Sequence, residues 1–146
     1  MIRIVLVATD GSEASETAVQ TAIDLTKSLG PDARLHVASV VDYAGVPEIL
    51  AKRPPDAPDL LADEADAAIS AAMATVAESG LEAESHLLHG DVVGALLARA
   101  ADVGADIMVA GFHGRNRFAR LVMGNVVGHL VRSTDLPVVV VRSPES

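Results

Sequence analysis

The sequence of 146 residues contains no cysteine and no tryptophan, and only 2% of its residues are aromatic. Without cysteine the chain can form neither disulfides nor thiolate metal sites, and it has no cysteine nucleophile. The absence of cysteine suits a reducing compartment, so we expect a cytoplasmic protein. Half of the residues are hydrophobic, so the core must be assembled from Val, Leu, Ile and Ala. Such side chains favour close packing of helices on a sheet.

The chain also lacks long apolar runs and an excess of positive charge. Its first apolar run, at residues 4–8, is too short for a signal peptide or a membrane span. The net charge is −9 and the pI is about 4.8. Because an acidic chain repels polyanions, we expect no nucleic-acid partner and no anionic membrane surface as partner. Any anion site must therefore be local.

Five apolar runs alternate with four amphipathic segments. The runs typical of strands cover residues 4–9, 35–41, 81–88, 106–110 and 136–141. The segments with helical spacing cover residues 14–29, 61–76, 92–100 and 121–132. Such alternation implies parallel strands joined by right-handed crossovers, in a chain of the usual size for one domain. We therefore predict a single α/β domain over residues 1–146, with a doubly wound, mainly parallel five-stranded sheet and four helices.

The character of each run suggests the strand order. The first, second and fourth runs are apolar on both faces and belong in the middle. The third belongs at an edge, because Leu81, Ala83, Ser85 and Leu87 alternate with Glu82, Glu84, His86 and Leu88. A flavodoxin-like order 3-2-1-4-5 satisfies this and places the last run at the other edge. That last run is long and uncharged, so it makes a poor exposed edge. We therefore expect a homodimer paired along Val138, Val139, Val140 and Val141.

In this order the winding direction reverses between the first and fourth strands, which leaves a crevice at their carboxyl ends. The first strand ends at Ala8, Thr9 and Asp10, and the fourth ends in a glycine-rich loop that starts at Gly111. We expect the missing Cβ atoms at Gly111 and Gly114 to let backbone amides approach a ligand. Free amides at a helix N-terminus near Gly124 would favour an anion.

The charges around this loop support an anion site. Residues 111–132 contain no acidic residue, in a chain with 20 acidic and 11 basic ones. The same stretch contains Arg115, Arg117, Arg120 and Arg132. We interpret the loop as a site for nucleotide phosphates. The alternative is that these arginines form a solvated helix face and that the glycines only permit tight turns.

The residues of this loop resemble a known family. Gly111, two residues, Gly114, nine residues, Gly124 and a small polar residue are similar to the nucleotide-binding pattern of the universal stress proteins. The flanking Val-Ala-Gly-Phe-His-Gly-Arg and Leu-Pro-Val-Val-Val-Val-Arg resemble that family too, as does the opening Asp10-Gly11-Ser12. The resemblance covers the whole chain. It implies the flavodoxin-like order, dimerisation through the last strand and, in the nucleotide-binding branch, ATP with Mg²⁺ as a candidate companion.

Carried onto this sequence, the resemblance implies a set of site residues. Asp10, next to Ala8 and Thr9, would lie at the adenine and ribose end, and Val40 or Val41 would pack on the base. The ribose and phosphate path would be lined by Ala110, Gly111, His113, Gly114 and Arg115. The amides around the phosphates would come from Gly124, Asn125, Val126 and Val127.

The chain departs from the family pattern at Asn125, where the pattern has Ser or Thr. A carboxamide can still donate to a phosphate oxygen, but it is longer than a hydroxyl. We expect weakened or re-posed binding, since the backbone amides are unchanged. The alternative is a ligand-free scaffold of the same fold, because the family also has a branch that lacks the pattern and does not bind ATP.

Other residues keep two interpretations. Asp10 is either a ligand contact or a helix N-cap with Glu13 as its capping-box partner, and His113 is either a ligand contact or an exposed turn residue. Residues 42–58 form either a lid or a disordered insertion. We expect no metal site, because His36, His86, His89 and His129 lack metal-ligand spacing. We also expect no enzyme, because no catalytic base or Lys-Ser/Thr P-loop ending is visible.

Overall fold

The computed structural model of the chain describes residues 1–43, 59–112 and 123–143, with the backbone only for residues 123–125. A five-stranded sheet forms its centre, and every strand pair in it is parallel. The strands are β1 (Ile4–Ala8), β2 (Arg34–Val41), β3 (Ala83–His89), β4 (Ile107–Phe112) and β5 (Val138–Arg142). Their order is β3-β2-β1-β4-β5. The predicted doubly wound architecture and strand order are confirmed.

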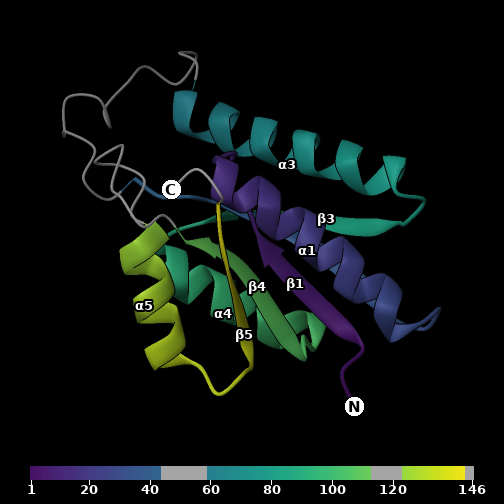
Figure 1. Cartoon of the computed structure of the whole chain (residues 1–146). Coiled ribbons are helices and arrows are strands. Elements are labelled where there is room, and N and C mark those ends of the chain that lie inside the picture. Colours follow the sequence, from purple (N-terminus) through teal and green to yellow (C-terminus); the bar gives the residue numbers. More distant parts are fainter. Residues whose placement is uncertain (44–58, 113–122, 144–146) are drawn as a thin grey trace.

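The described helices cover both faces of the sheet. They are α1 (Glu13–Leu29), α3 (Leu60–Glu78), α4 (Val92–Val103) and α5 (Met123–Ser133). Figure 1 shows α1 and α3 on one face, with α4 and α5 on the other. This two-sided cover explains why β1, β2 and β4 read as continuous apolar runs. No helix in the described ranges is long and apolar enough to cross a membrane.

The core has two layers, one on each side of the sheet. Val5 and Val7 of β1 face the α1 and α3 side, and Leu6 and Ala8 face the α4 and α5 side. Since the side chains of a strand alternate between faces, β1 contributes to both layers. Both layers consist almost entirely of Val, Leu, Ile and Ala, as the scarcity of aromatic residues predicted.

Local signals in the sequence set both ends of α4. Asp91 accepts a hydrogen bond from the Gly94 amide at 2.8 Å and caps α4. The same helix ends at Gly104, whose φ of 70° is left-handed, a conformation that glycine adopts without strain. These two signals explain why α4 begins and ends where it does.

The edge strand β3 corrects one detail of the sequence interpretation. The alternation placed Leu87 on the apolar face and Leu88 among the polar residues, but Leu88 is buried and Leu87 is 40% exposed. Leu88 packs into the layer covered by α4. An edge strand with helices near both faces buries side chains by local packing, which the alternation of residue types alone does not reveal.

Candidate functional site

The predicted crevice lies at the carboxyl ends of β1 and β4, which are neighbours in the sheet. Val7 of β1 pairs with Val109 of β4, so Ala8 and Ala110 follow side by side. Both alanines are buried. Both belong to the core layer under α4 and α5, so any ligand here would meet the residues that follow each strand.

After β1 the chain makes a turn that is fixed by hydroxyl groups. The Ser15 hydroxyl donates its only proton to the Ser12 carbonyl at 2.9 Å. In the 3.1 Å contact between the Thr9 and Ser15 hydroxyls, Thr9 is therefore the donor. The Thr9 oxygen in turn accepts from the Gly11 amide at 3.3 Å, and the Ser15 oxygen accepts from the Asp10 amide at 3.3 Å. Every proton in this network has a partner, and Thr9 and Ser15 are buried. The turn is therefore held rigidly over the crevice.

Asp10 does not cap α1, so of its two interpretations the N-cap with Glu13 as partner is excluded. The N-cap is Ser12, whose side chain accepts from the Ser15 amide at 3.2 Å. Asp10 Oδ1 instead accepts from the Ser12 amide at 2.9 Å. Among the described residues its second carboxylate oxygen has no hydrogen-bond partner. Asp10 therefore offers a positioned acceptor at the crevice.

Gly111 is part of β4, and the prediction that the loop begins there is corrected. A Cβ atom at this position would lie 2.5 Å from the carbonyl carbon of Ala14 and 2.8 Å from the Ser15 nitrogen. The missing side chain thus lets the first turn of α1 pack directly on β4. Packing of the protein on itself accounts for this glycine, and the same close approach brings the turn after β1 against the end of β4.

The two valines at the end of β2 differ in what they can contact. Val41 is buried, whereas Val40 is half-buried and packs on the α4 and α5 side of the sheet. Of the pair, Val40 is therefore the one with surface left to pack on a ligand.

The helix α5 starts where the sequence predicted a phosphate site. It begins at Met123, so Gly124 and Asn125 lie in its first turn. Val126 is half-buried and Val127 is buried. The first turn contains no acidic residue, and the first amides of a helix have no partner within it. These amides and the helix dipole favour an anion at this end.

Of the remaining predicted residues, most lie outside the described ranges and one lies at the far end of α5. His113, Gly114 and Arg115 lie outside the described residues, as do Arg117, Arg120 and residues 44–58 of the proposed lid. Arg132 lies in the last turn of α5, which a rise of 1.5 Å per residue places roughly 13 Å from the first turn. Its charge therefore does not serve the anion end of α5.

Comparison with known proteins places the chain among relatives of one kind. The model of the universal stress protein family matches residues 1–142. The stress response protein NhaX of Bacillus subtilis is 27% identical, over 94% of this chain and 96% of that protein. A putative universal stress protein of Staphylococcus saprophyticus, SSP1056, is 30% identical, over 97% of this chain and 84% of that protein.

Solved structures share the fold. Hypothetical protein MJ0577 superposes with a TM-score of 0.79 at 22% identity, over 100% of this chain and 99% of that one. A universal stress protein from Archaeoglobus fulgidus in complex with dAMP gives a TM-score of 0.69 at 19% identity, over 97% and 98% of the two chains. A universal stress protein in complex with cAMP gives 0.67 at 24% identity, over the same shares. With its family model, its strand order and its relatives in agreement, the chain belongs to the universal stress protein family.

Proposed function

We propose that this protein is a nucleotide-binding regulator of the stress response and that it binds ATP, accompanied by Mg²⁺, at the carboxyl ends of β1 and β4. One observation carries the proposal. The structure combines a rigid turn bearing the Asp10 acceptor with the acid-free first turn of α5, on strands where the winding direction reverses. Open α/β sheets bind ligands at such points.

The solved relatives support the adenine part of this proposal most directly. The ligands in the two complexes, dAMP and cAMP, share an adenine base and a phosphate. In this chain the adenine end falls to Asp10 and Val40, because an acceptor can serve the amino group of the base and a half-buried valine can pack on its ring. The phosphates then fall to the first turn of α5.

Binding, and not catalysis, is the activity that we propose for this site. The buried hydroxyls of Thr9 and Ser15 donate their protons within the turn, so neither is placed to act as a nucleophile. ATP occupancy would then act by changing the shape of the protein or its choice of partner.

We further propose that the protein is a homodimer paired along β5. The strand lies at the edge of the sheet, and Val140 on it is 42% exposed in the single chain. Four consecutive valines at an open edge favour pairing with another strand. A second copy of the same strand would cover it.

Asn125 favours a second candidate, a scaffold of the same fold that binds no nucleotide. It replaces the hydroxyl residue of the family pattern in the first turn of α5. The two candidates differ in one observable, which is whether the folded protein takes up ATP.

Calorimetric titration with ATP and MgCl₂ tests the proposal. Asp10→Asn keeps an oxygen for the Ser12 amide but replaces the second carboxylate oxygen by a donor, so the turn survives while the acceptor for adenine is lost. Loss of a hydrogen bond to a charged group predicts about tenfold weaker binding or more. Asp24→Asn, on the exposed surface of α1, is the matched control and should bind as the wild type does.

Two results would count against the proposal in different ways. Absence of binding by the folded wild-type protein at millimolar ATP would favour the scaffold. Equal affinity of wild type and Asp10→Asn would place the adenine elsewhere.

A further inference from the structure

Two histidines and a glutamate, far apart in sequence, meet on the sheet face that α4 covers. His36 lies in β2, and Glu84 and His86 lie in β3. His36 pairs with Glu84 and Ala38 pairs with His86 in the parallel register. Because side chains alternate along a strand, these three project from the same face. Strand pairing thus builds a cluster that residue spacing along the chain does not show.

The ligating atoms of the three side chains lie close together. His36 Nδ1 is 2.9 Å from His86 Nε2 and 3.4 Å from Glu84 Oε2. One ligand atom from each of the three residues lies within 4.8 Å of the other two. His36 is only 8% exposed, whereas the Glu84 side chain is 74% exposed.

With one proton on each imidazole, no placement of the protons gives every close contact in this cluster both a donor and an acceptor. Arg99 of α4 has Nη1 3.0 Å from His86 Nδ1, and since arginine only donates, His86 must hold its proton on Nε2 and give it to His36 Nδ1. The lone pair of His36 Nδ1 then also faces the Glu84 carboxylate. If His36 Nδ1 carries the proton instead and donates to His86 Nε2, neutral His86 must hold its own proton on Nδ1. Two donors, His86 Nδ1–H and Arg99 Nη1–H, then face each other. Each arrangement leaves one mismatched contact.

We propose that His36, Glu84 and His86 form a binding site for a divalent transition-metal ion, with Zn²⁺ as the representative ion. His36 Nδ1, His86 Nε2 and a Glu84 oxygen would be the ligands, and water would fill the fourth position on the exposed Glu84 side. Two imidazoles and a carboxylate are an established ligand set for zinc. Bonds of about 2.0–2.1 Å in a tetrahedron place ligand atoms roughly 3.3 Å apart, close to the two separations from His36 Nδ1 of 2.9 Å and 3.4 Å. A cation receives all three lone pairs at once and removes the mismatch.

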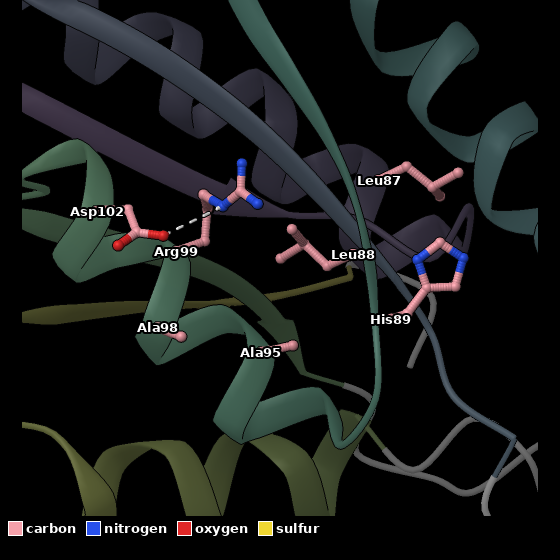
Figure 2. Close-up of a pocket in the computed structure, with 7 residues that line it drawn as sticks. All are labelled: Leu87, Leu88, His89, Ala95, Ala98, Arg99 and Asp102. Carbon is pink, nitrogen blue, oxygen red and sulfur yellow. Dashed lines mark ion pairs between the residues drawn. The ribbon is translucent and has the colours of Figure 1, made fainter.

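Arg99 is the group that must move for the ion to bind. On binding, the His86 proton shifts from Nε2 to Nδ1, with no net release, and Nδ1–H no longer accepts from Arg99. The guanidinium has an alternative partner, because its Nε lies 3.9 Å from Asp102 Oδ2 one turn further along α4. Figure 2 shows Arg99 and Asp102 joined in this way. Both line a hollow of about 280 Å³ between β3 and α4. Arg99 therefore competes with the metal and would set its affinity.

Titration of the full-length protein with Zn²⁺, measured by calorimetry, tests this site. A parallel titration with Co²⁺ reports the coordination number through the visible spectrum of a four-coordinate ion. We expect saturable binding of one ion per chain. Glu84→Gln, an exposed change that leaves the core intact, should weaken binding about tenfold or more, and His86→Gln should abolish it. The matched controls are the exposed neighbours Glu82→Gln and His89→Gln, which should bind as the wild type does.

Arg99→Met supplies a readout that a merely structural cluster would not give. Methionine keeps the apolar stem of the side chain and removes the competing cation, so zinc should bind several-fold more tightly. The proposal is overturned if the folded wild type shows no saturable one-to-one zinc binding. It is equally overturned if Glu84→Gln and His86→Gln bind zinc as tightly as the two controls.

Discussion

At Gly111 the backbone of β4 runs directly beneath the first turn of α1. The nearest atoms to a Cβ there are backbone atoms of Ala14 and Ser15, which cannot move without shifting the helix. From the sequence, this glycine predicted a ligand-binding loop. The structure explains it by helix packing, and no pattern of residue types distinguishes these two uses of a missing side chain.

Gly111→Ala should therefore destabilise the fold. Overpacking against backbone predicts a loss of about 3 kcal/mol in the free energy of unfolding, at the upper end of the usual range. Gly128→Ala is the control, because its Cβ would meet only the end of the Arg132 side chain at 3.4 Å, and alanine within a helix should add roughly 0.5–1 kcal/mol. Urea unfolding measures both. Equal stability of Gly111→Ala and wild type would contradict the packing account.

Asp106 ties the start of β1 to the start of β4. Its Oδ2 accepts from the amides of Arg3 at 2.9 Å and Ile4 at 3.0 Å, and these two bonds lower the pKa of Asp106. A lowered folded-state pKa stabilises the fold above the unfolded pKa, and this contribution is lost as the pH falls through the folded pKa.

Asp106→Asn should accordingly lower the thermal midpoint at neutral pH, and its deficit relative to wild type should shrink in acid as the wild-type carboxylate takes up its proton. Thermal unfolding followed across acidic pH measures this difference. Asp66→Asn, an exposed change on α3, is the control. A deficit that stays constant as the pH falls would show that charge is not the cause.

At the scale of elements, the sheet was the most predictable part of the molecule. Burial on both faces made β1, β2 and β4 predominantly apolar, and this pattern placed them in the middle. The side chains on β3 were less predictable, because Leu87 and Leu88 are both apolar and only packing against α4 decides which one is buried. The contact of His36 with His86 depends on the register of two strands, which residue types do not encode.

The open edge of β5 gives the prediction that belongs to this scale. Val140→Lys places a charge on an exposed position of the edge, where it opposes strand pairing. The fold of the single chain should persist, and sedimentation should show monomers in place of the wild-type dimer. Val131→Lys, at a half-exposed position of α5, is the control. A monomeric wild type, or a Val140→Lys variant that still dimerises, would contradict the β5 dimer.

For the molecule as a whole, the strand order was predictable, but the local hydrogen bonds at the candidate site were not. Parallel pairing puts the carboxyl ends of β1, β2 and β4 at one edge of the sheet, where Asp10 and Val40 lie. The detail depends on local hydrogen bonds, since Ser12 and not Asp10 caps α1 and Thr9 and Ser15 lock the turn. These bonds depend on the exact backbone geometry of the turn between β1 and α1, so the sequence shows their members without their connections.

The most direct test of the central claim is an NMR titration of ¹⁵N-labelled protein with ATP and MgCl₂, because it reports both occupancy and place. The account predicts progressive shifts of the backbone amides at Thr9, Asp10 and Val40 and in the first turn of α5. Amides that line the hollow between β3 and α4, such as those of Leu87 and Arg99, should not move. Unchanged spectra at millimolar ATP, or shifts confined to that hollow, would contradict it.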